Sequence, residues 1–266
     1  MWLRNLFTKT LRDLRSQILG WGIGAGLLGA MVIFLYPAFK DQMGAMLEML
    51  KSYPPALSAF FGDFNQMPFF LGWLNIEFYS YGPPILAIFA VVVGTGLVAG
   101  EEEKGTLDLL LSHPIRRWRL VADKFAAFAV ATVLIMALIA LFFVSSSVMI
   151  GETSQLGRMA LATMNIVPIT LAGGALALMA SVLFRSRRLA NLMALAVIIG
   201  SYFLESLGKA VDVLEPYRPI ALFHYYDSYA ALFEGLKWGD VGILLALTAL
   251  FFAVSLFAFQ RRDIAV

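Results

Sequence analysis

The sequence predicts an all-α polytopic membrane protein with six transmembrane helices, and three observations lead to this fold class. Apolar residues make up 60% of the 266 residues and charged residues only 14%, against about 45–50% and about 25% in ordinary soluble chains. The mean hydropathy is +0.80. Six segments are long and apolar enough to cross a hydrocarbon core about 30 Å thick, which takes about 20 residues. A water-soluble domain of this length could not bury so much apolar side chain.

The six expected spans are separated mostly by charged clusters, and we treat residues 1–266 as one transmembrane domain. The spans are residues 18–39, 78–100, 125–150, 161–184, 189–207 and 241–260. The first span follows a basic start, as the apolar region of a secretory signal peptide does. Its apolar run is longer than the usual 7–15 residues, and no small-residue cleavage site follows it. We therefore expect a retained helix.

The distribution of Lys and Arg predicts the orientation, because cytoplasmic connections are enriched in both residues. The N-terminus, residues 101–124, residues 185–188 and the C-terminal tail carry 14 of the 20 Lys and Arg residues. We therefore expect a multi-pass protein of the inner or plasma membrane, embedded in the lipid bilayer, with both termini in the cytoplasm. Residues 40–77 and 208–240 are then the long outer connections.

The residues before the first span have the pattern of a basic amphipathic helix over about residues 2–16. Leu6, Leu11 and Leu14 share one helical face, and Arg4, Lys9 and Arg12 lie mostly elsewhere. Helices of this composition lie in the membrane interface with their apolar face in the acyl boundary. The alternative is a positively charged flank that only sets the orientation.

Patterns of catalysis and cofactor binding are missing from the sequence. The chain has no Cys and two distant His residues, and it contains no phosphate-binding loop, HExxH or GxSxG motif. Residues 24–29 match GxGxxG, but inside an uncharged span, so we interpret these glycines as helix-packing positions. We expect no catalytic residue, no metal, no cofactor bound by this chain and no nucleic-acid partner. Glu77 and Glu205, near the outer ends of two spans, are candidates for either a transport or a structural role.

The second cytoplasmic connection, residues 101–124, is unusually dense in motif-like residues. An acidic cluster, Glu101 to Glu103, precedes a short expected helix that Thr106 caps or opens and that ends before Pro114. Four of the five residues from 107 to 111 are Leu, so this helix exposes an apolar surface. Such a surface with charges around it is typical of a partner site. The alternative is a tight turn whose leucines enter the lipid.

The string from Gly100 to Lys124 resembles the cytoplasmic loop of ABC-2-type transporter permeases, which has a pattern close to G-E-(E/K/R)-E-x-G-T-(L/I)-(D/E)-x-L-L-(x)2-P followed by basic residues and Lys. The basic N-terminal helix and the C-terminal string from Phe259 to Ile264 are also similar to that family. The resemblance implies the membrane-spanning subunit of an ATP-driven exporter, working as a homodimer or as a heterodimer with a related permease. It also implies a separate cytoplasmic ABC ATPase subunit that binds the ATP and Mg.

The resemblance further implies which residues contact the ATPase and which line the pathway or the dimer interface. The ATPase-docking and coupling residues would be Glu101, Glu102, Glu103, Gly105, Thr106, Leu107, Asp108, Leu110, Leu111, Pro114, Arg116 and Arg117. The translocation pathway or dimer interface would include Phe78, Tyr79, Tyr81, Pro83, Pro84, Tyr202 and Glu205. The substrate would be hydrophobic or amphipathic, such as a drug, an antibiotic or a lipid. The alternative is an ATP-independent secondary carrier or channel, a class that usually has charged residues at the membrane midplane, where this chain has none.

Overall fold

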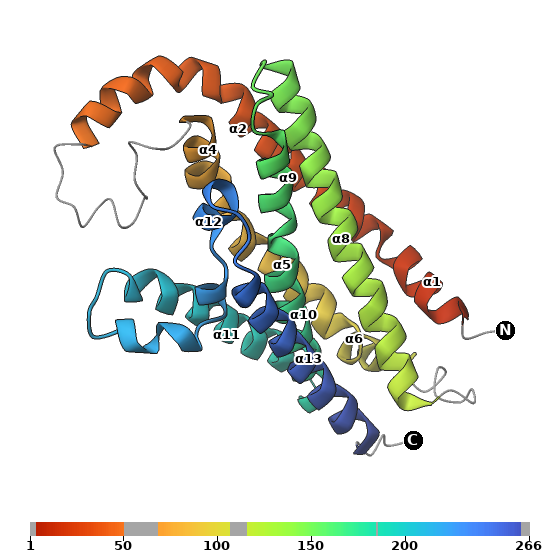
Figure 1. The fold of residues 1–266 in the computed structure, drawn as a ribbon. Coiled ribbons are helices and arrows are strands. Elements are labelled where there is room, and N and C mark those ends of the chain that lie inside the picture. The colour runs from red at the N-terminus through yellow and green to blue at the C-terminus, as the bar shows by residue number, and fades with distance from the viewer. Residues whose placement is uncertain (1–3, 51–68, 107–115, 185, 262–266) are drawn as a thin grey trace.

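The computed structural model describes residues 4–50, 69–106, 116–184 and 186–261, and every regular element in these ranges is helical (Figure 1). Six helices are long and apolar enough to cross a membrane, which confirms the predicted number of spans. They cover Arg15–Lys40, Phe70–Gly96, Arg117–Met149, Leu156–Leu183, Arg187–Gly208 and Trp238–Arg261. The all-α polytopic fold class is therefore confirmed.

The N-terminal region forms two helices, α1 (Arg4–Asp13) and α2 (Arg15–Leu50). Helix α1 is the expected amphipathic helix, and its Leu6 is buried where α1 packs against α8 (Arg117–Met149). Its location in the membrane interface stays a prediction. Helix α2 continues past the expected end of the first span, through Pro37 and as far as Leu50.

The second span is built from several short pieces. A first turn, α4 (Phe69–Leu74), leads into a π-helix, η1 (Asn75–Tyr79), and then into α5 (Gly82–Gly96) and α6 (Ala99–Glu103). Two prolines occupy the first turn of α5, where a missing N–H costs least. The apolar stretch begins at Phe70, earlier than the predicted residue 78, because α4 and η1 precede α5.

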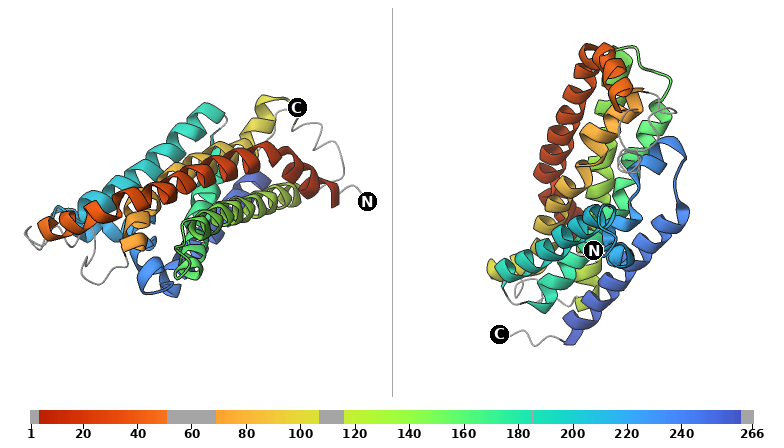
Figure 2. Two further views of the ribbon diagram at one scale, coloured as in Figure 1. Left: turned by 90° about the horizontal axis from the view of Figure 1, so that it is seen from above. Right: turned by 90° about the vertical axis from the view of Figure 1, so that its left-hand side faces the viewer.

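The third and fourth spans pack beside one another. Helix α8 begins inside the connection predicted for residues 101–124, so Lys124 is a buried helical residue and no longer part of a loop. The fourth span consists of α9 (Leu156–Met164) and α10 (Ile166–Leu183), which are separated at Asn165. Figure 2 shows α8 lying alongside α2, and these two helices pack against each other along much of their length.

The last two spans are α11 (Arg187–Gly208) and α13 (Trp238–Arg261). The connection between them folds into two 3₁₀-helices, η2 (Glu215–Ile220) and η3 (Leu222–Tyr225), and a short helix, α12 (Ser228–Phe233). Asp227 caps α12, because its Oδ1 accepts a hydrogen bond from the backbone N–H of Ala230 at 2.9 Å. This connection is therefore ordered by its own capping and turn contacts.

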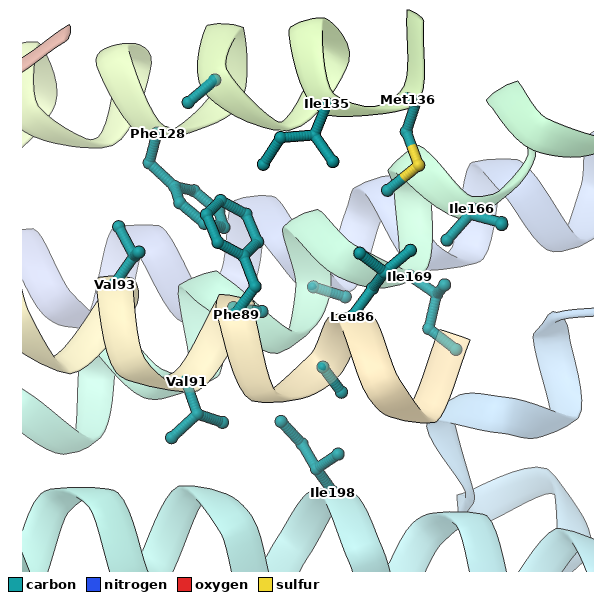
Figure 3. Packing of buried hydrophobic residues seen from close by; sticks show 14 of the residues in the cluster. Leu86, Phe89, Val91, Val93, Phe128, Ile135, Met136, Ile166, Ile169 and Ile198 are labelled. Carbon is teal, nitrogen blue, oxygen red and sulfur yellow. The ribbon is translucent and has the colours of Figure 1, made fainter. Parts of the chain in front are cut away.

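Helix α10 lies at the centre of the bundle and packs against α5, α8, α11 and α13. Aromatic and aliphatic side chains fill the space around it, including Phe89 and Phe128, whose stacked rings lie 5.6 Å apart (Figure 3). The helices α5 and α10 meet at glycines: a Cβ added at Gly94 would lie 2.6 Å from the carbonyl oxygen of Gly174. This backbone-to-backbone approach is the small-residue packing typical of membrane helices.

Candidate coupling site

The acidic residues of the family-like string lie at one end of the bundle. Figure 1 shows α6 at the end where α1 begins, α8 begins and α13 finishes. Helix α6 carries Glu101, Glu102 and Glu103. The first of these residues is half-buried and forms the centre of the site.

Glu101 pairs with a lysine of the next span. Lys124 of α8 donates a hydrogen bond to Glu101 Oε1 at 2.7 Å and a second to the backbone carbonyl of Leu97 at 2.9 Å. The Lys124 side chain is only 4% exposed and that of Glu101 is 26% exposed. The hydroxyl of Thr106 donates to the other carboxylate oxygen. One carboxylate thus joins α6, α8 and the turn that follows α6.

The interruption between α5 and α6 leaves a backbone carbonyl free to accept the hydrogen bond from Lys124. Residues Leu97 and Val98 separate α5 from α6, and Val98 has φ −120° and ψ −62°, outside the helical range. The backbone N–H of Glu101 therefore bonds to the carbonyl of Val98 instead of that of Leu97. The carbonyl oxygen of Leu97 is left to accept from the ammonium group.

The pairing also sets the protonation state of Glu101. Burial alone would raise the pKa of this carboxyl, but the charge and hydrogen bond of Lys124, with a smaller contribution from Lys9 of α1, lower the pKa below its ordinary value. Glu101 is therefore ionised at neutral pH, and the pair is a salt bridge in a mostly dry environment.

A second contact links α6 to α11. Arg187 opens α11, and its Nη1 lies 3.5 Å from Glu103 Oε2. The guanidinium group lies over two glycines of the second span, since a Cβ at Gly96 or Gly100 would approach it to 3.6–3.7 Å. These two glycines make room for a planar cation.

The remaining predicted coupling residues are only partly described. Gly105 has a φ of +64°, a conformation that favours glycine, and the hydroxyl of Thr106 donates back to Glu101. Arg116 and Arg117 are exposed at the start of α8. The expected docking helix falls outside the described residues, and this applies to Leu107, Asp108, Leu110, Leu111 and Pro114.

The predicted pathway or interface residues lie near the ends of α5 and α11 that are farthest from α6. The structure divides these residues into two groups. Phe78 and Tyr79 are buried in the bundle: the Phe78 ring meets Phe143 edge-on, and the Tyr79 hydroxyl donates to the carbonyl of Met159 at 3.0 Å. Pro83 is also buried. The other four residues line one pocket, and they are Tyr81, Pro84, Tyr202 and Glu205.

Glu205 forms the second ion cluster of the molecule. Its carboxylate accepts two hydrogen bonds from Arg218, at 2.8 and 3.2 Å, and lies 3.2 Å from Lys209 Nζ and 3.1 Å from His224 Nδ1. The hydrogen bond to the carboxylate raises the pKa of Arg218. The cluster attaches the 3₁₀ segments η2 and η3 to the end of α11.

Two residues of the candidate coupling site were missed by sequence reasoning. Lys124 and Arg187 entered it only as charges that set the orientation, and Lys124 also as the last residue of the family-like string. A signal for Lys124 existed, because it directly precedes an apolar span and an ionisable residue entering a span is a functional candidate. Within the described ranges, no group of three His, Asp or Glu side chains could hold a metal ion.

Comparison with known proteins places the chain in a family. A family model described as ABC-2 family transporter protein matches residues 4–264. The chain is also similar to the uncharacterized membrane protein YdbK of Bacillus subtilis (strain 168), with 26% identity over 209 residues that cover 72% of this chain and 84% of that protein. The recognition from the string at residues 100–124 is confirmed. This chain belongs to the ABC-2 family of transporter proteins and is a multi-pass membrane component of a transporter.

Proposed function

We propose that the chain is the permease subunit of an ATP-driven exporter and couples, through residues 101–124, to a separate cytoplasmic ABC ATPase. The observation that carries the proposal is the attachment of α6 to two spans at once. Glu101 holds it to α8 and Glu103 holds it to α11, next to the string that resembles the family's coupling loop. The ATP and Mg belong to the partner subunit.

The attachment offers a route for mechanical work. Movement of the loop by a closing ATPase would displace α6, and the ion pairs would transmit the displacement to α8 and α11. The Glu101–Lys124 pair suits this role because its lysine is buried, where an ionic contact is stronger than in water. The break at Leu97 and Val98 lets α6 move without carrying α5 rigidly with it.

The proposal also covers the contact with a second permease copy, the orientation of the chain in the membrane and the transported substrate. A second permease copy would meet this one partly through α2, α5 and α11, where apolar side chains such as Ile85, Val92 and Leu192 are exposed. The end that carries α6 would face the cytoplasm, together with both termini. The cargo would be hydrophobic or amphipathic.

The test is to look for an ABC ATPase in the adjacent reading frames, to co-express it with the chain and to purify the complex. We expect the two to co-purify, and we expect Leu110→Asp or Leu111→Asp to abolish the association without loss of membrane insertion. Glu101→Gln should leave the association intact and uncouple transport from ATP hydrolysis. Association that survives both Leu substitutions would contradict the docking proposal. Solute transport driven by an ion gradient, with this chain as the only protein in vesicles, would instead favour a secondary carrier or channel.

A further inference from the structure

A pocket of about 360 Å³ lies at the ends of α5 and α11 that are farthest from α6. Its walls come from η1, the start of α5, the end of α11 and the connection that precedes α13. The volume is in the range of small-ligand sites, which is about 300–1,000 Å³. Solvent reaches the pocket, because Tyr81 and Lys209 in its walls are both exposed.

Glu205 is the acidic side chain in the described lining of this pocket, and its carboxylate is already fully engaged. Oε1 lies 2.8 Å from Arg218 Nη2 and 3.2 Å from Lys209 Nζ. Oε2 lies 3.2 Å from Arg218 Nε and 3.1 Å from His224 Nδ1. A carboxylate has about four acceptor positions, so these four nitrogen atoms occupy them. Glu205 therefore has little to offer a cationic ligand.

Lys209 is the charged group that remains available to a ligand. Arg218 and His224 contact Glu205 but do not line the pocket, whereas Lys209 does. Because the guanidinium group of Arg218 alone balances the charge of the carboxylate, the ammonium group of Lys209 leaves the pocket with an excess of positive charge. An ammonium group has three donor hydrogens, and the single ion pair of Lys209 with a described residue is the one with Glu205.

The neighbouring acidic residues do not cancel this excess. Asp227 is next to the pocket, but its carboxylate already accepts from Lys237 Nζ at 2.7 Å and from the backbone N–H of Ala230 at 2.9 Å. The other acidic residues of the surrounding segments are exposed, where water screens their charge, and they do not line the pocket: Glu77, Asp212, Glu215 and Glu234.

Hydroxyl groups add further donors around Lys209. Ser206 precedes Lys209 by one turn of helix, and Tyr81 and Ser228 come from other walls of the pocket. These three hydroxyls have no hydrogen-bond partner among the residues that the structure describes, and they are not sealed from solvent. An ammonium group surrounded by hydroxyl donors suits the oxygens of a phosphate or a carboxylate, because hydrogen bonds to an ionised acceptor are the stronger ones.

We propose that this pocket binds an anionic oxygen group, a phosphate or a carboxylate, with Lys209 as its charge partner and the hydroxyls of Ser206 and Ser228 as donors. The group is either a free ion or the head of an amphipathic molecule, since both present the same oxygens. Tyr202 and Phe223 form an aromatic wall of the pocket, which limits the water around the bound anion and strengthens its contact with the ammonium group. The binding does not rest on the proposed exporter function.

The test uses the full-length chain in dodecyl maltoside, a detergent with neither charge nor phosphate, at constant ionic strength. The probes are radiolabelled inorganic phosphate and dihexanoyl phosphatidic acid. We expect saturable binding of at least one probe, and competition by hexyl glucoside and hexyl trimethylammonium that is at least tenfold weaker than self-competition. Tighter binding of inorganic phosphate identifies a free ion, and tighter binding of the phosphatidic acid identifies a head group. No saturable binding of either probe, or equal competition by the uncharged or cationic compound, would overturn the proposal.

Two lysines at the same end of the bundle separate the pocket from other basic sites. Lys209→Gln should weaken probe binding at least tenfold. Lys237→Gln is the matched control, because Lys237 is also exposed and also forms an ion pair, with Asp227, but does not line the pocket. It should leave probe binding unchanged. Unchanged binding in Lys209→Gln, or an equal loss in both variants, would overturn the proposal.

A further variant blocks the pocket and keeps the lysine. Ser206→Asp places a carboxylate one turn from Lys209, so it should abolish the rise in unfolding temperature that the bound probe gives the unaltered protein. The unfolding temperature without probe shows that the variant is folded. A probe-dependent rise that persists in Ser206→Asp would overturn the proposal, even if Lys209→Gln does not fold. Probe binding by a chain that recruits no ATPase would support the pocket and contradict the exporter function.

Discussion

The two ends of the bundle each have a glutamate in an ion cluster, but the buried partner differs. At the α6 end the cation is buried, since the Lys124 side chain is 4% exposed against 26% for Glu101. At the opposite end the anion is buried: Glu205 is 7% exposed, whereas its partners Lys209, Arg218 and His224 are 45%, 24% and 31% exposed. Loss of the glutamate therefore leaves a buried charge at one end and solvated charges at the other.

The comparison indicates different roles for the two clusters. An ion pair with a buried member is costly to break, because the remaining charge cannot be hydrated. The Glu101–Lys124 pair thus behaves as a rigid connection between α6 and α8. The Glu205 cluster instead fastens a surface segment to α11, and its cations can return to water when the carboxylate is removed.

The largest expected effect comes from Glu101→Ala, which strands Lys124. We expect this variant to lose about 3–5 kcal/mol of stability, measured by thermal or chemical unfolding in nanodiscs. Asp212→Ala, at an exposed acidic residue, should change stability by less than about 0.5 kcal/mol. An equal effect of the two substitutions would remove the basis for a rigid connection at the α6 end.

Replacing both members of the pair tests whether the connection serves stability or coupling. The double variant Glu101→Leu/Lys124→Met should recover the stability that Glu101→Ala loses, because well-packed apolar side chains often replace a buried ion pair without cost. It should still fail to link ATP hydrolysis to transport in the assembled complex. Restored transport by the double variant would show that any contact of α6 with α8 is sufficient.

At the other end, Glu205→Gln should have a smaller effect than Glu101→Ala. We expect a loss of about 1.5–3 kcal/mol, the value of hydrogen bonds to a charged group, because the partners that remain are solvated. Limited proteolysis should then cut the segment from Glu215 to Tyr225 faster than in the unaltered protein. A stability loss as large as that of Glu101→Ala would contradict the distinction between the two clusters.

The smallest expected effect is the change in stability with pH that the titration of Glu101 causes. Its pKa is lowered on folding, so the pair contributes its full stability above the ordinary carboxyl pKa of 4.5, and the contribution is lost only as the pH falls through the lower folded value. The stability difference between the unaltered protein and Glu101→Gln should be constant from pH 7 to about pH 5 and shrink below pH 4.5. A difference that fades between pH 7 and pH 5 would mean that the pKa of Glu101 is raised.

The fold could be predicted from the sequence because spans have a length and composition that few other segments share. The number of spans followed from these local properties. The internal breaks did not, since nothing in the residues near Asn75 or Val98 distinguishes a π-helix or an interruption from a regular turn. Span ends at Phe70 and Arg117 were missed for the same reason.

The candidate coupling site was predicted less completely, because its main contact is non-local. The string of residues 100–124 contains both Glu101 and Lys124, but they are 23 residues apart and lie on different helices, so the string does not show that they pair. Likewise Glu205 was noticed at the edge of a span, while Arg218 and His224 come from a connection with no periodic pattern. The sequence predicts which helix a residue belongs to, but it does not predict which helices contact each other.

The interruption between Gly96 and Ala99 has a consequence for how relatives of this chain can diversify. It divides the second span into two helices, α5 and α6. The side chains of the two helices need not follow one continuous helical periodicity. Under the proposed function, substitutions in α5 that suit a new cargo would accumulate without disturbing α6. A transporter assembled this way would change what it carries while it keeps the same ATPase partner.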